Sequence, residues 1–413
     1  MPVLGVWLWP ETVEKSGAEK TLNRCVKMGV TDIFFLTKGL SGRVSFRSGI
    51  APRGQERDLL GEVLSAAHDR GVRVHAWFTS ANDEHYKALH PESGRCHYVR
   101  GKDKGLISLT DEGYLSYIRG ILREAARNYD IDGLHLDYIR YNHLTYGWDE
   151  KDVMRYAAAG ADMAHVRALM DRTFLRGEKN EENCIFDALR AGDESVRAMA
   201  RVRREDVRRF ARELILPIRA ERKQIMVSAA LMPEGAYDDT AFADLHYGQS
   251  YEDAAVLYDC VLPMAYSQAY GKDGGWVRRV AEGAHKRNVR TVMGLHAFEG
   301  GTGKTLLEDI RALKGAPTEG ICLFRAGAFV MAWHDGGRLW LYNPLEASVT
   351  AVLADGEPLP LRAPLEPGEE SSVPLSAFPK EIRAFTENRE VCAYLAGTDG
   401  LTRAENESID QQE

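Results

Sequence analysis

The sequence predicts an α/β protein: a (β/α)8 TIM barrel with a large insertion after its fourth strand and a small antiparallel β module at its C-terminus. Short apolar runs alternate with longer segments of helical period, and eight such runs occur before residue 328. Strands that alternate with helices form a parallel sheet through right-handed crossovers. Eight units in about 325 residues fit a closed barrel with insertions, since about 250 residues are typical of that fold.

An open, doubly wound sheet is the alternative arrangement of such units. That fold usually carries a glycine-rich phosphate-binding turn after its first strand. Here the first strand leads into WPETVEKSG, from Trp9 to Gly17, which has no such turn. We therefore favour the closed barrel.

Each expected strand is a short apolar run, and helical segments separate the strands. Two of these helices have clear ends. LLGEVLSAAHDRG stops at Gly71, and DEGYLSYIRGILREAARN starts after Thr110, which we expect to be its N-cap. In chain order the expected strands are Val3–Trp9, Thr31–Thr37, Val72–Phe78, Ile131–Asp137, Gln224–Leu231, Asp259–Tyr266, Arg290–His296 and Glu319–Ala326.

The barrel is expected to span residues 1–328. Residues 142–200 mix helical and polar loop segments directly after the fourth strand, so we expect an insertion that forms a lid or one wall of a cleft. Between residues 329 and 396, apolar and polar residues alternate, with Asn-Pro, Asp-Gly and Pro-Gly turn signals between the runs. That pattern predicts the antiparallel β module. Residues 397–413 form a polar tail that we expect to be disordered.

The composition narrows the kind of partner. Lys and Arg total 53 against 61 Asp and Glu, a formal net charge of −8, which disfavours nucleic acid and favours a neutral or small-molecule ligand. The six cysteines are scattered without a Cys-x-x-Cys pair, so the spacing excludes a zinc knuckle, and reduced thiols are expected. We expect no cofactor, and the sequence leaves the oligomeric state open.

The sequence also bears on location. No apolar run reaches the roughly 20 residues that span a bilayer, so we expect no membrane span. The first residues lack the basic start and small-residue cleavage site of a signal peptide. As written, the protein is expected to be cytoplasmic, whereas it would be secreted or envelope-associated if a native leader had been removed.

Asp137 is the first candidate for catalysis. The active site of a TIM barrel forms at the C-terminal ends of its strands. In IDGLHLD, successive side chains alternate between the two faces, so Leu134 and Leu136 face the helices. His135 and Asp137 then point into the barrel, with Asp137 at its mouth. Asp132 stands at the opposite end of the strand and is expected to be structural.

Other strand ends carry polar and aromatic side chains that point to the same mouth. Aromatic faces stack on the C–H surfaces of sugar rings, and polar groups hydrogen-bond to sugar hydroxyls. We therefore expect a carbohydrate substrate. The residues concerned are Trp9, His75, Trp77, Tyr266, Gln268 and His296, with Glu234 and Glu299 just beyond two strand ends.

Four stretches of the chain resemble the glycosyl hydrolase-like 10 (DUF187-type) family of TIM barrels. They are LLGEVLSAAHDRGVRVHAWF, NYDIDGLHLDYIRY, REDVRRFARELILPIRAERKQIMVSAA and YDCVLPMAYSQ. The similarity runs from about Val3 to Ala326, and it implies a (β/α)8 glycosidase that acts on bacterial cell-wall or related glycans. By position, the resemblance marks His75, Trp77, His135, Asp137, Arg140, Tyr266 and Gln268.

The chain departs from this family pattern directly after Asp137. Members usually have Asp-Tyr-Arg-Tyr-Pro there, whereas this chain has Tyr138, Ile139, Arg140, Tyr141 and Asn142. One acidic residue of a pair is therefore replaced by tyrosine.

Cleavage of a glycoside needs two carboxyl groups, one as a protonated acid and one as an ionised nucleophile or base. Asp137 is one of them. Glu234 is our choice for the general acid, because it follows the neighbouring strand, and Glu299 is the next candidate. Two other functions stay open: a glycan-binding protein without catalytic activity, and a metal-dependent hydrolase. The metal ligands would then be His75, His135, Asp137 and His296.

Overall fold

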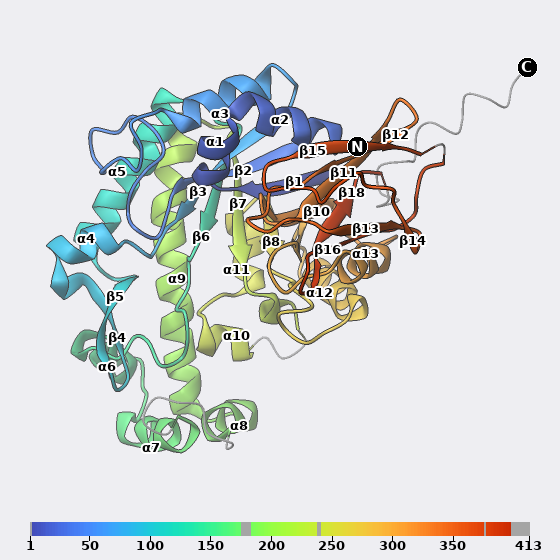
Figure 1. Ribbon diagram of the computed structural model, residues 1–413. Helices are drawn as coiled ribbons and strands as arrows, with labels where there is room; N and C mark the ends of the chain where they lie inside the picture. Colours follow the sequence, from blue (N-terminus) through green and yellow to red (C-terminus); the bar gives the residue numbers. More distant parts are fainter. Residues whose placement is uncertain (1, 175–182, 238–240, 376, 398–413) are drawn as a thin grey trace, which may run out of the picture.

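The computed structural model describes residues 2–174, 183–237, 241–375 and 377–397. An eight-stranded parallel sheet lies at its centre (Figure 1). Each strand overlaps a predicted run and extends at most one residue beyond it, although some strands are up to three residues shorter at one end, so all eight predicted strands are confirmed. They are β1 (Val3–Leu8), β2 (Asp32–Lys38), β3 (Arg73–Thr79), β6 (Gly133–Asp137), β7 (Met226–Leu231), β8 (Cys260–Pro263), β9 (Met293–His296) and β10 (Gly320–Ala326).

The sheet closes on itself. Its strands follow the order β8-β7-β6-β3-β2-β1-β10-β9, so neighbours in the chain are neighbours in space. The two terminal strands, β8 and β9, meet through parallel bridges from Val261 to Thr291 and from Met264 to Gly294. The predicted (β/α)8 TIM barrel is therefore confirmed.

Helices surround the barrel and bury their apolar faces against the outer face of the sheet. Helix α5 (Glu112–Asn128) begins one residue later than predicted: Asp111, not Thr110, is its N-cap, and its side chain accepts a hydrogen bond from the Tyr114 N–H. Asp111 is the N-cap because it lies three residues before Tyr114, whose N–H has no acceptor within the helix. The surrounding helices are α1 (Pro10–Ser16), α2 (Ala18–Lys27), α3 (Leu59–His68), α5 (Glu112–Asn128), α9 (Glu194–Glu221), α11 (Tyr251–Leu257), α12 (Gly274–Lys286) and α13 (Gly303–Ala312).

Two long excursions leave the barrel at the ends of β3 and β6. After β3 the chain forms α4 (Glu84–Leu89), a 3-10 turn (Pro91–Ser93) and the hairpin of β4 (Gly94–His97) and β5 (Gly101–Ile107), which the sequence analysis did not predict. After β6 it forms α6 (Glu150–Ala158), α7 (Met163–Thr173) and α8 (Cys184–Ala191). These three helices share a separate apolar core with the first part of α9, at the bottom of Figure 1.

The chain after β10 forms two four-stranded sheets that share a core of their own. The pairings are antiparallel apart from that of β11 with β18, which is parallel. Of the predicted tail, residues 398–413 lie outside the described residues. The strands are β11 (Val330–Asp335), β12 (Arg338–Tyr342), β13 (Ala351–Ala354), β14 (Glu357–Pro358), β15 (Glu370–Pro374), β16 (Ile382–Phe385), β17 (Glu390–Val391) and β18 (Ala393–Leu395).

This C-terminal module (Val330–Leu395) follows β10 directly, where a regular barrel would place its eighth helix. Trp333 and Tyr342 belong to the same apolar core as the barrel helices. The module therefore covers the side of the barrel next to β1 and β10, at the right of Figure 1. Within the described residues, none of the helices is long and apolar enough to span a bilayer.

Candidate active site

The alternation of β6 divides its side chains as expected. Leu134 and Leu136 belong to the core between the sheet and the helices. His135 and Asp137 point into the barrel, where their partners come from neighbouring strands. Asp132, before the strand, accepts hydrogen bonds from the Val74 N–H at 2.7 Å and from His68 at 2.9 Å, which is a structural role at the closed end of the barrel.

His135 lies in the barrel core below the mouth. Its Nε2 accepts a hydrogen bond from the Trp7 Nε1–H at 3.1 Å, and its Nδ1 lies 2.9 Å from the Ser228 hydroxyl. Burial holds its pKa well below the usual range, so the ring is neutral. His135 therefore orders the packing beneath the site, and it does not line the pocket.

His75 is also a core residue. Its Nε2 lies 2.8 Å from Asp32 Oδ1, and its ring stacks on Phe34 with centroids 4.5 Å apart. Gly133 of the neighbouring strand makes room for it, because a Cβ at residue 133 would lie 2.1 Å from His75 Nδ1. The structure thus places His75 and His135 inside the barrel and away from the mouth.

A pocket of about 230 Å³ opens at the C-terminal ends of the barrel strands, with Asp137 in its wall. Side chains from seven barrel strands or the residues just after them form it, and six of them carry aromatic rings. Such a surface suits a sugar ring, whose C–H faces pack on aromatic side chains. The pocket is lined by Trp7, Trp9, Leu36, Leu40, Trp77, Thr79, Asp137, Tyr138, Arg140, Ala230, Met264, Tyr266 and Phe324. Of the predicted residues, it brings together Trp9, Trp77, Asp137, Arg140 and Tyr266.

The Asp137 carboxylate is only 6% exposed and is held from two sides. Oδ2 accepts a hydrogen bond from the Trp77 Nε1–H at 3.2 Å, and Oδ1 accepts one from the Tyr138 backbone N–H at 2.6 Å. Tyr138 has φ 57°, a conformation that non-glycine residues rarely adopt. Burial raises the pKa of Asp137, while the Arg140 charge and the two N–H donors oppose that rise.

The guanidinium of Arg140 is half-buried and lies 5.1 Å from the centroid of the Tyr138 ring. Among the described residues it makes no ion pair, and its buried Nε has no hydrogen-bond acceptor. Its charge acts on both Asp137 and Glu234, lowering the pKa of each. The Nε1 of Trp9, in the same pocket, is a second buried donor without an acceptor. Unpaired buried donors are costly, so these two are ready to bind acceptors of a ligand.

Glu234 lies beside this arrangement without lining the pocket itself. It belongs to a 3-10 turn, Pro233–Ala236, three residues after β7, and it is 9% exposed. Its Oε1 accepts hydrogen bonds from the hydroxyls of Tyr247 and Tyr270, each at 3.2 Å. Burial raises its pKa, and the two tyrosines and Arg140 oppose the rise. Glu234 is therefore a buried carboxyl group in the turn after β7, the strand that pairs with β6 of Asp137.

Three predicted residues lie around the loop after β9. Glu299 is 78% exposed and forms an ion pair with Arg389 of the C-terminal module at 2.9 Å. Gln268 accepts a hydrogen bond from the Thr305 hydroxyl at 2.9 Å and donates one to the Gly300 carbonyl. His296 lies 3.1 Å from the Glu299 carbonyl and stacks on Phe298. None of the three lines the Asp137 pocket.

The residues weighed above as metal ligands do not gather around one point. His75 and His135 are engaged with Asp32 and Ser228 deep in the barrel, and His296 turns to the loop after β9. Within the described part of the chain, no group of three or more His, Cys, Asp or Glu side chains is arranged to hold a metal ion.

Sequence reasoning missed several residues of the site. Phe324 could have been found, because alternation along β10 puts it on the inward face with Cys322 at the strand end. Tyr138 directly follows Asp137 but lies beyond the strand, where alternation no longer applies. Tyr247 and Tyr270 carry no local signal, since they reach Glu234 only through the folding of the loops after β7 and β8.

Glycoside hydrolases are among the solved structures with a similar fold. The glycoside hydrolase domain of PgaB (BpsB) from Bordetella bronchiseptica has a TM-score of 0.61 at 14% identity, covering 78% of this chain and 94% of that chain. The catalytic domain of a beta-amylase from Paenibacillus polymyxa has a TM-score of 0.56 at 11% identity, with 78% and 92% covered. A beta-galactosidase from Marinomonas ef1 has a TM-score of 0.54 at 14% identity, with 78% and 54% covered. At such low identity the likeness concerns the fold alone.

The sequence itself matches one family. The profile of the family described as glycosyl hydrolase-like 10 matches residues 40–297, which include the chain from β3 to β9. No curated protein sequence matches the chain significantly.

Proposed function

Because the chain belongs to the glycosyl hydrolase-like 10 family, we propose that it is a glycoside hydrolase whose active site is the pocket around Asp137. Its substrate is a bacterial cell-wall glycan or a related oligosaccharide or polysaccharide. The observation that carries the proposal is the Asp137 carboxylate itself. It is nearly buried, yet it lines an aromatic pocket at the end of the barrel where the strands deliver their functional side chains.

The polar groups of the pocket support a sugar as the ligand. The Arg140 Nε–H and the Trp9 Nε1–H lack acceptors among the described residues, and sugar hydroxyl oxygens would supply them. The rings of Trp77, Tyr138 and Tyr266 offer apolar surface for the C–H groups of the same sugar. A pocket of this size accommodates about one pyranose ring beside the carboxylate.

The two carboxyl groups differ in their hydrogen-bond partners, which supports different roles. Both oxygens of Asp137 receive N–H groups, which donate but cannot accept, so this arrangement favours the ionised form. The partners of Glu234 are tyrosine hydroxyls, which can donate to a carboxylate or accept from a protonated carboxyl. We therefore assign Asp137 as the nucleophile or base and Glu234 as the general acid.

In this scheme Glu234 gives its proton to the glycosidic oxygen as the C–O bond breaks. Asp137 either takes a proton from the attacking water or attacks the anomeric carbon itself. In the second case water, deprotonated by Glu234, then breaks the bond between Asp137 and the sugar. The positive charge that develops on the sugar is stabilised by the Asp137 carboxylate. Arg140 lies within electrostatic range of both carboxyl groups, and its charge favours the ionised form of Asp137 against the effect of burial.

The test compares Asp137→Asn and Glu234→Gln on two kinds of substrate. One is purified peptidoglycan, followed by release of reducing ends. The other is a set of 2,4-dinitrophenyl glycosides, whose leaving group departs without protonation. Loss of Asp137 should lower kcat/KM by about 10³-fold or more on both substrates. Loss of Glu234 should lower kcat/KM strongly on peptidoglycan only, because the dinitrophenolate leaves without a proton in the first step.

The outcomes separate the competing functions. If Asp137→Asn leaves turnover unchanged, the catalytic assignment is wrong. If wild-type protein binds the glycan without releasing reducing ends, the protein is a glycan-binding protein and the hydrolase proposal fails. If Glu234→Gln lowers kcat/KM equally on both substrates, the general acid is another residue.

A further inference from the structure

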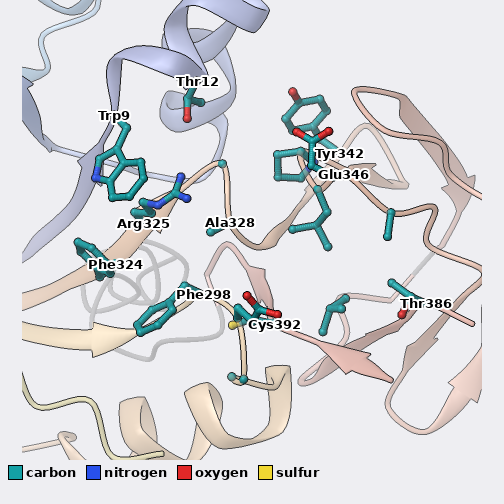
Figure 2. A pocket seen from close by; sticks show the side chains of 18 of the residues that line it. Trp9, Thr12, Phe298, Phe324, Arg325, Ala328, Tyr342, Glu346, Thr386 and Cys392 are labelled. Carbon is teal, nitrogen blue, oxygen red and sulfur yellow. The ribbon is translucent and has the colours of Figure 1, made fainter. Parts of the chain in front are cut away.

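A second, larger cavity lies between the barrel and the C-terminal module. Its volume is about 1140 Å³. Figure 2 shows Trp9, Phe324 and Arg325 on the barrel side and Tyr342, Glu346 and Thr386 of the module across from them. The ends of β1 and β10 thus form one side of the cavity, and two loops of the module form the other. Neither the barrel nor the module could form the cavity alone.

The large cavity continues the Asp137 pocket. Trp9 and Phe324 line both spaces. Their rings meet edge to face with centroids 6.5 Å apart, and Phe324 also contacts Tyr266 of the pocket, with centroids 5.6 Å apart. An aromatic surface therefore runs from the catalytic carboxylate toward the module, which suits a chain of sugar rings.

We infer that the two spaces form a single cleft, in which a linear, uncharged glycan chain runs from the Asp137 pocket to the C-terminal module. This inference rests on the proposed function for the identity of the pocket. It adds that the module is part of the substrate-binding site and that the preferred substrate is a polymer, not a short glycoside.

The size of the cleft supports a chain of several rings. Sites for small molecules usually hold about 300–1,000 Å³. The Asp137 pocket lies below that range and the large cavity exceeds it. One sugar ring fits the pocket, and the remaining rings of a longer chain would fill the cavity beyond Phe324.

The charges of the large cavity favour an uncharged chain. Most of its charged side chains already have ion-pair partners: Lys15 pairs with Glu346 at 2.6 Å, and Arg389 with Glu299 at 2.9 Å. Glu390 pairs with Arg383 at 2.6 Å. Among the described residues of the lining, Glu11 and Arg325 remain without an ion pair, and their opposite charges cancel. A polyanion would find no excess of positive charge.

The polar groups on the cavity wall can still bind sugar hydroxyls. The Arg325 guanidinium lies 3.6 Å from the centroid of the Trp9 ring and makes no ion pair to a described residue, so its N–H groups remain available for hydroxyl oxygens. Burial lowers its pKa, but an arginine stays charged at neutral pH. It lies where the pocket and the large cavity join.

The module is fixed firmly enough to act as a wall. The Arg24 guanidinium of α2 stacks 3.6 Å from the centroid of the Tyr342 ring and donates a hydrogen bond of 3.0 Å to the Glu370 carboxylate. At the other side, Gly303 of α13 lies so close to the module that a Cβ there would be 2.5 Å from the Ile382 carbonyl oxygen. The cleft is therefore a fixed feature of the fold.

The test blocks the module end of the cleft. Ala347 is an exposed residue of the module wall, and Ala347→Trp would fill the cleft far from Asp137. Ala363→Trp is the matched control, because Ala363 is an exposed loop residue of the module outside the cavity. The probes are β-1,4-linked N-acetylglucosamine oligomers from disaccharide to hexasaccharide. Binding is measured by titration calorimetry on Asp137→Asn protein, which prevents turnover.

Affinity should rise with chain length, and Ala347→Trp should reduce the hexasaccharide-to-disaccharide affinity ratio by about tenfold. Ala363→Trp should keep the ratio of the parent protein. The inference is overturned if Ala347→Trp keeps that ratio, if affinity does not depend on length, or if no oligomer binds. If affinity rises with chain length and falls in Ala347→Trp, but the protein hydrolyses no glycan, the cleft is supported and the proposed function is refuted. If hydrolysis depends on Asp137 but Ala347→Trp has no effect, the proposed function is supported and the cleft is refuted.

Discussion

The indole N–H of Trp77 donates a hydrogen bond of 3.2 Å to Asp137 Oδ2, joining the ends of two paired barrel strands. Thr79 and Asp137 are register partners on β3 and β6, so Trp77 lies one inward position deeper than the carboxylate. The bond therefore orients the carboxylate from below and favours its ionised form. Several expected outcomes depend on this relationship and on the charges around it.

Trp77→Phe keeps an aromatic ring but removes the donor to Asp137. Loss of the bond should raise the pKa of Asp137, because the N–H stabilises the carboxylate. The acid limb of the kcat/KM profile should move to higher pH, and kcat/KM should fall about five- to tenfold. Trp148→Phe, which removes an indole bond to Leu144 outside the site, is the control. If the acid limb does not shift in Trp77→Phe, the hydrogen bond does not affect the pKa of Asp137, and Trp77 only contributes to packing.

Arg140→Gln removes the positive charge next to both carboxyl groups. That charge lowers the pKa of Asp137 and of Glu234, so both pKa values should rise. Both limbs of the pH–rate profile should move to higher pH. Because charge-assisted bonds to a ligand contribute about 1.5–3 kcal/mol, kcat/KM should fall by about tenfold or more. Arg311→Gln, on the exposed side of α13, should change neither. A shift of one limb alone would contradict the shared influence of Arg140.

Asp309→Asn should stabilise the protein at high pH. Burial raises the pKa of Asp309 to about 7 from its ordinary 3.8. The folded state therefore holds this proton more tightly than the unfolded state, and the free energy of unfolding falls as the pH rises through that window. Asparagine can keep the bond from the Ser267 hydroxyl, which is 2.5 Å long in the parent.

The gain for Asp309→Asn should be on the order of 2–4 kcal/mol at pH 8 and near zero at pH 4. Urea unfolding at the two pH values measures it. Glu357→Gln, at an exposed carboxylate of β14, is the control and should give no such difference. Equal effects of Asp309→Asn at both pH values would mean that the carboxyl is not protonated in the folded protein.

Gly303→Ala tests how tightly the module is held on the barrel. The added Cβ would meet the Ile382 carbonyl oxygen at 2.5 Å, so the interface must shift. Overpacking of this kind costs about 1–3 kcal/mol of unfolding free energy, measured as a lower Tm. Gly275→Ala, in the first turn of α12, meets its nearest atom at 3.3 Å and should be neutral or slightly stabilising. Equal Tm values for the two variants would mean that the interface yields easily.

Much of the site's framework was readable from the sequence because the relevant rules are local. Alternation along a strand assigns Leu134 outward and Asp137 inward, whatever the rest of the chain does. The βαβ order then brings all strand ends to one mouth. Family resemblance and alternation together pointed to Trp77, Arg140 and Tyr266, and these three line the pocket.

The tertiary structure decided how deep each inward side chain lies in the barrel and which residues it contacts. Alternation says that His75 and His135 point inward, but only the register between strands places them beneath the mouth. Similarly, Glu299 follows a strand end, yet it turns outward because Arg389 of the module, ninety residues away in the chain, offers it an ion pair.

By itself, then, the sequence determined the eight strands, the faces of their side chains and the position of Asp137 at the barrel mouth, since each follows from periodicity within one element. Only the fold decided that the Arg140 Nε lacks an acceptor among the described residues, that Tyr247 and Tyr270 hold Glu234, and that the module and the barrel enclose a cavity beside the pocket. These features depend on where separate loops meet in space, and no periodic pattern within a single strand or helix encodes such a meeting.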